Sequence, residues 1–151
     1  MALVCRGIRG ATTAAENTRS AILTATRELL ERIIAANDLC AEDIASVMFS
    51  TTADLNAEFP AVAARALGWH DTALFCAHEI AVPGSVKRCI RVLILWNTAR
   101  RADEIVHIYL RGATSLRPEH ATLSSVPLPD PFEIVVGSDE QTSDPMVHSA
   151  A

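Results

Sequence analysis

The chain has 151 residues, half of them hydrophobic, which suits one compact domain that removes about 70% of its unfolded-chain surface from water. Its 13 basic and 18 acidic residues give a net charge of −5 without any cluster of Lys and Arg, which argues against electrostatic binding to nucleic acid or to an anionic membrane. No apolar run is long enough to span a bilayer, and Arg6 comes too early for a signal peptide, so we expect a soluble protein inside the cell.

The first two predicted elements are a strand and a long helix. Residues 2–9 have a strand pattern, and the small and hydroxyl-bearing residues 10–13 are typical of a turn, which places Arg9 at the C-terminal end of the strand. From 18 to 36, apolar residues recur at helical spacing against charged ones, so we expect an amphipathic helix of about five turns. The polar pair 37–38 should end it.

The next segment predicts strand, helix and strand. Residues 44–50 form a second strand pattern, and Pro60 is well placed for the first turn of a short helix over 61–67. Gly68 is a typical helix end. A third strand is expected over 72–77.

A long apolar strand over 89–96 contains a charged residue, Arg91. Because its neighbours are apolar at alternate positions on both sides, the strand should be buried on both faces, where an unpaired cation costs several kcal/mol. Arg91 must therefore meet a buried carboxylate, a partner subunit or an anionic ligand. The strand alone leaves an internal salt bridge and a ligand contact both open.

The order of the elements predicts an α/β (α+β) domain with a mixed β-sheet and two main helices on one face. Residues 104–110 should pair with the long strand as an antiparallel hairpin, through the short polar connection 97–103. The sheet face without helices needs cover, and we expect other copies of the chain to supply it in a symmetric oligomer.

The sequence divides into a folded part, 1–118, and a C-terminal tail, 119–151. The tail is rich in Pro, Ser and acidic residues, and most of it should be flexible. Its apolar island 132–136 could add an edge strand or dock on a neighbouring subunit, and the sequence favours neither.

Metal, nucleophile and phosphate-loop chemistries all lack a signature. His78 and Glu79 are adjacent, so on a strand their side chains would face opposite ways, and the other histidines fall at no ligand spacing. No G-x-S-x-G motif is present, and Gly7, Gly10 and Gly84 form no phosphate loop. We therefore expect neither a metal nor a cofactor.

The four cysteines are widely spaced and lie in or beside apolar stretches: Cys5, Cys40, Cys76 and Cys89. Because no C-x-x-C pair is present, we expect reduced core thiols rather than disulfides or zinc ligands. Such thiols suit the cytoplasm.

A set of polar side chains near strand and helix ends stands out: Arg9, Arg65, Glu79, Arg91, Tyr109 and Arg117. Each has a structural explanation by itself; Arg65 could complement the dipole of its helix, and Glu79 could simply be solvated. Together, several arginines suit a small dianionic ligand, because guanidinium groups bind carboxylates through two hydrogen bonds. A single Glu beside them could select a hydroxyl of that ligand.

Six short segments carry a resemblance to a known family. They are 6–13 (RGIRGATT), 53–60 (ADLNAEFP) with Arg65, 76–79 (CAHE), 87–92 (KRCIRV), 107–110 (HIYL) and 116–118 (LRP). In this order they resemble the monofunctional chorismate mutases of the trimeric α/β class, which is distinct from the all-helical class. The resemblance covers about residues 4–118 and leaves the tail out.

The resemblance implies a cytoplasmic isomerase of aromatic amino acid biosynthesis, in the shikimate pathway. It would convert chorismate to prephenate by an intramolecular [3,3] rearrangement, which needs no nucleophile, metal or cofactor. An enzyme can accelerate this reaction by holding the flexible dicarboxylate in its reactive conformer and by placing charge where the breaking C–O bond becomes negative. The resemblance also implies a homotrimer with a sheet-lined pseudo-barrel core.

The same resemblance assigns roles to the polar side chains. Arg91 would donate to the ether oxygen and to a carboxylate of the substrate, while Arg9 and Tyr109 would hold carboxylate. Glu79, with the backbone near Cys76, would accept from the ring hydroxyl and could balance charge on the allyl fragment.

In this family the pocket lies between subunits. Phe59, Ala61 and Arg65 should therefore come from the neighbouring subunit, and Leu116 and Arg117 should close the mouth of the pocket.

Two residues depart from the family pattern. Val62 stands where a lysine is expected near the pocket entrance, and Phe75 stands where a small hydroxyl residue often precedes the cysteine. The first change removes a peripheral cation, and the second should make the pocket wall more apolar. Neither touches the central Arg91.

Two other functions stay open on the sequence alone. A trimeric binding or sensor protein could use the same arginine pocket to hold a small carboxylic acid of the aromatic pathway without converting it. A structural oligomer could pair its arginines internally. Turnover of chorismate separates the enzyme from both.

Overall fold

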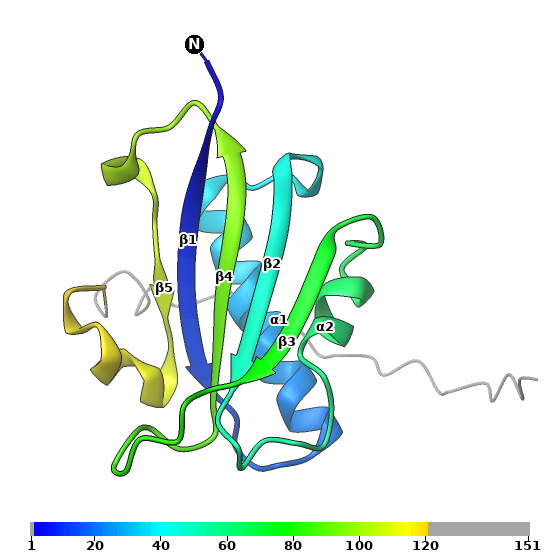
Figure 1. The fold of residues 1–151 in the computed structure, drawn as a ribbon, viewed down its shortest axis with the longest axis vertical. Coiled ribbons are helices and arrows are strands. Elements are labelled where there is room, and N and C mark those ends of the chain that lie inside the picture. Colours follow the sequence, from blue (N-terminus) through cyan, green and yellow to red (C-terminus); the bar gives the residue numbers. More distant parts are fainter. Residues whose placement is uncertain (1, 121–151) are drawn as a thin grey trace, which may run out of the picture.

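The computed structural model describes residues 2–120, which form a five-stranded sheet with helices (Figure 1). The helices and strands are β1 (Val4–Thr13), α1 (Arg19–Asn37), β2 (Ile44–Thr51), α2 (Ala61–Ala66), β3 (Ala73–His78), β4 (Cys89–Thr98) and β5 (Ile108–Tyr109). Short 3₁₀ helices are η1 (Ala41–Asp43), η2 (Ala102–Glu104), η3 (Arg111–Leu116) and η4 (Pro118–His120). Both predicted helices are therefore confirmed, but most of the predicted tail, with its 132–136 island, lies outside the described residues.

The sheet has the strand order β3-β2-β4-β1-β5, so β4 is its central strand. β4 runs antiparallel to both of its neighbours, whereas β3 is parallel to β2 and β5 is parallel to β1. The predicted class, an α/β (α+β) fold with a mixed sheet, is confirmed.

The predicted hairpin between 89–96 and 104–110 is wrong. β4 pairs along its whole length with β1 on one edge and over residues 90–96 with β2 on the other, so both of its edges are occupied and it cannot accept a third strand. The later segment forms only the two-residue strand β5, which pairs in parallel with the far edge of β1.

The first strand does not end at Arg9, as the sequence predicts, but continues to Thr13. Arg9 therefore lies inside the strand, and Gly10 is a strand residue rather than part of a turn. A Cβ added to Gly10 would lie 2.8 Å from Ile33 Cδ1 and 3.1 Å from Ile108 O. The glycine thus serves the close packing of α1 on the sheet.

Both helices pack on one face of the sheet, as predicted (Figure 1). Leu29 and Ile33 of α1 are buried in one cluster with Ile8, Val92 and Ile94 of the sheet. Removing each such side chain from water contributes about 1.5–3 kcal/mol to folding. Within residues 2–120, no helix combines the length and the apolar character needed to cross a membrane.

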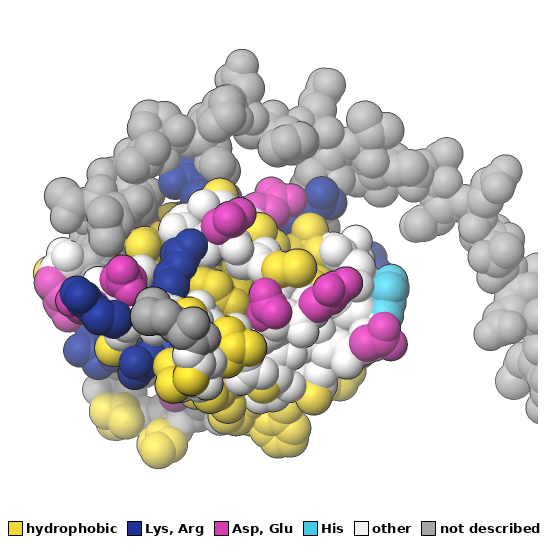
Figure 2. Space-filling view, turned by 90° about the horizontal axis from the view of Figure 1, so that it is seen from above, with side chains coloured by type: hydrophobic (Ala, Val, Ile, Leu, Met, Phe, Trp, Pro, Cys, Tyr) yellow, Lys and Arg dark blue, Asp and Glu magenta, His cyan; other side chains and the backbone are white. Residues whose placement is uncertain are grey.

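The opposite face of the sheet, called the open face below, is not covered by the described helices. On β4, Arg91 is exposed there and Leu93 is half-buried, while Met48 and Phe75 on the neighbouring strands are 48% and 60% exposed. Figure 2 is a view along the strands, in which the open face lies at the bottom of the picture. Hydrophobic side chains gather along that lower edge of the molecule. The prediction that the long strand is buried on both faces is therefore wrong for a single chain.

Side chains fix both ends of α1. At its start, Thr18 Oγ1 accepts a hydrogen bond from Ala21 N at 3.2 Å, and at its end Asp38 adopts a left-handed conformation with φ of 53°. The fully buried Asn37 donates to Val106 O and accepts from Val106 N, at 2.9 Å each. These bonds tie the end of α1 to the segment that leads into β5.

We predict that Asn37→Ala lowers the free energy of unfolding by about 2 kcal/mol or more, because it leaves partly buried backbone groups of Val106 unpaired. Chemical denaturation followed by circular dichroism measures this loss. Thr24→Ala, at an exposed position of the same helix, is the matched control and should change the stability by less than about 0.5 kcal/mol. Equal stability of the two variants would contradict the prediction.

Candidate active site

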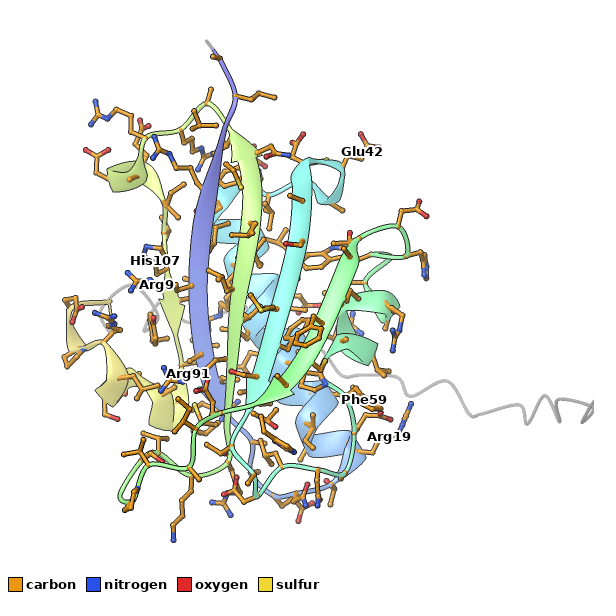
Figure 3. All side chains as sticks on the ribbon, viewed as in Figure 1. Arg9, Arg19, Glu42, Phe59, Arg91 and His107 are labelled. Carbon is orange, nitrogen blue, oxygen red and sulfur yellow. The ribbon has the colours of Figure 1, made fainter. Side chains whose placement is uncertain are left out.

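Four of the predicted site residues line one cavity on the open face. Arg9 of β1, Arg91 of β4, Tyr109 of β5 and Glu79, which follows β3, surround a volume of about 360 Å³. Strand register explains why they meet, because Ala11 pairs with Arg91 on one side and with Tyr109 on the other. Figure 3 shows Arg9 and Arg91 along β1, on the side of β5. The cavity thus combines two guanidinium groups, a carboxylate and a phenol.

Arg91 and Glu79 form a loose ion pair. Arg91 Nε lies 3.6 Å from Glu79 Oε1, which is beyond the usual hydrogen-bond distance. Their side chains are 45% and 31% exposed, so water screens the pair, and pairs of this kind contribute less than about 1 kcal/mol. The internal pair that the sequence left open therefore exists, but it leaves most of the five N–H donors of the guanidinium available to an anion.

Ser50, a residue that the sequence reasoning missed, holds the Glu79 carboxylate. Ser50 Oγ donates a hydrogen bond to Glu79 Oε1, while Glu79 N donates to Thr51 O at 2.8 Å. Ser50 also lies directly opposite Arg91 in the register of β2 and β4. A polar residue at the end of the predicted strand 44–50 was the available signal, but its partner depends on how the strands pair.

The strand pair β1 and β5 holds Arg9 and Tyr109. Arg9 N donates to His107 Nδ1 at 3.0 Å, and the two side chains lie next to each other in Figure 3. Tyr109 is buried and packs with Ala11 and Ala113. The backbone of Arg9 and the ring of Tyr109 are thus held by contacts made within one subunit.

The other predicted binding residues lie elsewhere in the chain. Phe59 and Cys76 line a second cavity of about 280 Å³, beside β3. Cys76 packs against the core on the helix side of the sheet, Ala61 is buried at the start of α2, and Arg65 is exposed on that helix. In Figure 3, Phe59 is labelled toward the β3 edge of the sheet, and Arg91 is labelled toward the β5 edge. Within one chain, these four residues do not reach the Arg91 cavity.

The loop that carries Phe59 is fixed by residues at the start of α1. Asn17 Oδ1 accepts hydrogen bonds from two successive backbone N–H groups of the loop, at 3.0 Å each. Arg19 Nε lies 2.9 Å from Glu58 Oε2, and Phe59 N donates to Glu58 Oε1 at 2.8 Å. This backbone hydrogen bond is the main cause that lowers the pKa of Glu58. The exposed Phe59 ring is therefore presented by a well-held loop.

Leu116 and Arg117 follow β5, close to Tyr109 in the fold. Leu116 packs on the cluster that contains Tyr109, whereas the exposed Arg117 lies 3.7 Å from Glu119 in an ion pair. Neither residue lines the Arg91 cavity of the single chain. Leu116 is connected to the cavity through its contact with the Tyr109 cluster, and Arg117 follows it in the chain.

The two residues that depart from the family pattern lie outside the Arg91 cavity. Val62 is half-buried on α2, and Phe75 stands on the open face, opposite Met48. Phe75 lines neither of the two cavities. Its position on β3 directs it outward with the uncovered side chains, and the expectation that it forms a wall of a pocket between subunits stays a prediction.

The cysteines are free, as predicted, but only Cys89 lies in the core. Cys5 and Cys40 are exposed, because they lie at the start of β1 and in the connection before η1, and Cys76 is half-buried. Burial raises the pKa of the thiols of Cys76 and Cys89, and nearby Arg65 and Arg91 respectively oppose this effect. Residues 2–120 contain no group of three His, Cys, Asp or Glu side chains that could hold a metal ion.

The chain is similar to known proteins over its folded part. The family model of chorismate mutase type I matches residues 5–120. The chain is 51% identical to chorismate mutase AroH of Thermus thermophilus, over 76% of this chain and 94% of that protein. It is 43% identical to chorismate mutase AroH of Bacillus subtilis, over 78% of this chain and 93% of that protein. A solved chorismate mutase structure from Clostridium thermocellum has a TM-score of 0.72 and 47% identity, covering 73% of this chain and 98% of that one.

We predict that iodoacetamide at pH 8 alkylates Cys40 before Cys76 and Cys89. Only the thiolate reacts, and a raised pKa lowers the thiolate fraction of the half-buried Cys76 and the buried Cys89 at this pH, while burial also hinders access. Peptide mass spectrometry over a time course measures the order. In denaturant, the three cysteines should react at similar rates, and modification of Cys76 before Cys40 in the native protein would contradict the prediction.

Proposed function

The chain belongs to the type I chorismate mutase family, and we propose that it isomerises chorismate to prephenate with Arg91 and Glu79 at the centre of a site that a neighbouring subunit completes. As a chorismate mutase it is an isomerase. The observation that carries the proposed site is the single cavity that joins Arg9, Glu79, Arg91 and Tyr109. No observation favours the non-catalytic binding protein over the enzyme.

The two arginines suit the two carboxylates of the substrate. Arg9, with Tyr109 beside it, holds one carboxylate, and Arg91 reaches the other carboxylate and the ether oxygen. Negative charge grows on that oxygen as the C–O bond breaks, and one well-placed donor typically contributes about 3–4 kcal/mol to transition-state stabilisation. The 3.6 Å separation of Arg91 Nε from Glu79 supports this role, because the guanidinium is not consumed by an internal bidentate pair.

Among the described residues that line the cavity, only Glu79 carries a negative charge. It accepts a hydrogen bond from the ring hydroxyl of the substrate and balances positive charge on the allyl fragment. The rearrangement is intramolecular, so no side chain needs to form a covalent bond or transfer a proton. The chain's residues act by holding the reactive conformer and by fixed charge.

We place the site between the subunits of a homotrimer, with the open faces turned inward to form its sheet-lined core. The exposed apolar side chains of the open face support this assembly, since a soluble chain gains by burying Met48 and Phe75. Phe59, Ala61 and Arg65 would then reach the Arg91 cavity of the next subunit. Leu116 and Arg117 would close the mouth of that cavity: Leu116 packs on the cluster that contains Tyr109, and Arg117 follows it in the chain.

We also propose that the enzyme works in the cytoplasm, in the supply of phenylalanine and tyrosine. The four free cysteines support a reducing compartment, where exposed thiols such as Cys5 and Cys40 stay unpaired.

We predict that the purified protein accelerates the loss of chorismate's ultraviolet absorption, and that Arg91→Lys lowers kcat by about 100-fold or more. An ammonium group cannot bond the ether oxygen and a carboxylate in the fork geometry of guanidinium. Arg27→Lys, on the exposed surface of α1, is the matched control and should turn over chorismate like the wild type. Near-normal turnover by Arg91→Lys would contradict the catalytic role of Arg91 and indicate a structural one.

Subunit exchange tests whether the site is shared. Arg65→Ala should mainly raise KM, and Arg91→Ala should abolish most turnover. After exchange of equal amounts of these two variants, about one quarter of the sites in random trimers hold both arginines, so activity at low chorismate should exceed the sum of the separate proteins. Native mass spectrometry verifies the exchange, and hybrid trimers without any recovery would exclude a shared site.

A further inference from the structure

The Glu79 carboxylate is held from two directions on the open face. Its backbone N–H donates to Thr51 O at 2.8 Å, which anchors the residue just beyond the end of β3. Its side-chain Oε1 accepts the hydrogen bond from Ser50 Oγ and also faces Arg91 Nε at 3.6 Å. Ser50 and Arg91 therefore share one carboxylate oxygen, but only the serine lies within hydrogen-bond distance of it.

This arrangement differs from the usual geometry of a guanidinium and a carboxylate that lie side by side. A flexible glutamate beside a guanidinium normally closes to a hydrogen-bonded pair of about 2.7–2.9 Å, often with both carboxylate oxygens. Such a closed pair would occupy the N–H donors of Arg91 and the oxygens of Glu79 with each other. Ser50 lies opposite Arg91 across β2 and β4, so its hydroxyl can hold the carboxylate short of that contact.

We propose that Ser50 is a positioning residue that keeps Glu79 from closing on Arg91, so that both charged groups stay available to the substrate. The role rests on the proposed chorismate mutase site, because it serves Arg91 and Glu79 in that site. Ser50 itself carries no charge and acts only through the orientation of Glu79. The requirement is for a hydroxyl at this place on β2, which Thr can supply and Ala cannot.

Kinetics of four variants test the role. Ser50→Ala should lower kcat by about tenfold or more, since a hydrogen bond to a charged group is lost, with a smaller change in KM. Ser50→Thr retains the hydroxyl and should recover most of kcat. In a Glu79→Ala background, Ser50→Ala should have no further effect on kcat, because the group that it positions is gone.

A crystal structure of Ser50→Ala gives a readout that does not depend on activity. The Arg91 Nε to Glu79 Oε distance should shorten from 3.6 Å to within hydrogen-bond range, about 2.7–2.9 Å. A serine that only stabilised the fold would leave this distance unchanged and would lower kcat equally with and without Glu79.

The outcomes separate the two proposals. A wild-type protein that does not convert chorismate refutes the proposed function, and the crystal structure still decides whether Ser50 holds Glu79 away from Arg91. If the wild-type protein converts chorismate, any one of three results overturns the positioning role. These are an unchanged kcat in Ser50→Ala, additive losses of kcat when Ser50→Ala is combined with Glu79→Ala, and an unchanged position of Glu79 in the crystal structure of Ser50→Ala.

Discussion

The structure depends on the alternation of side chains along β4, the central strand. Every second residue, such as Val92 and Ile94, is buried beneath α1, and the residues between them point to the open face with Arg91. Because β4 is hydrogen-bonded to neighbours on both edges, its register cannot slip without turning Arg91 into the core. The packing of the hydrophobic core therefore also fixes the direction of the guanidinium.

Local patterns in the sequence predict the elements well but not their pairing. The helical periodicity around Leu29 and the Pro60 and Gly68 signals locate both helices, because amphipathicity and helix ends are properties of neighbouring residues. The extension of β1 past Arg9 was not predictable in this way, since Gly10 is required by contact with Ile33 of another element. The partner of β5 was missed for the same reason: the free edges of a sheet are decided by the whole topology.

The candidate site shows the same division. Residue chemistry and family resemblance pointed to Arg9, Glu79, Arg91 and Tyr109, which the fold brings to one cavity. Ser50 was not found, because no role can be assigned to a single serine in a strand until its neighbour on the adjacent strand is known. The expected burial of Arg91 failed in the single chain because sequence hydrophobicity does not distinguish cover by the chain's own helices from cover by other copies.

The loop that carries Phe59 has a consequence for the energetics of assembly. Asn17 and Glu58 hold this loop through contacts within its own subunit, so its conformational entropy is lost when the chain folds. In the proposed trimer, a neighbour then receives an already ordered aromatic side chain, and association does not have to order a mobile segment. Preorganisation of this kind strengthens binding without any added contact area. The residues at the start of α1, far from Arg91 in the view of Figure 3, would thus help to determine how tightly the subunits associate.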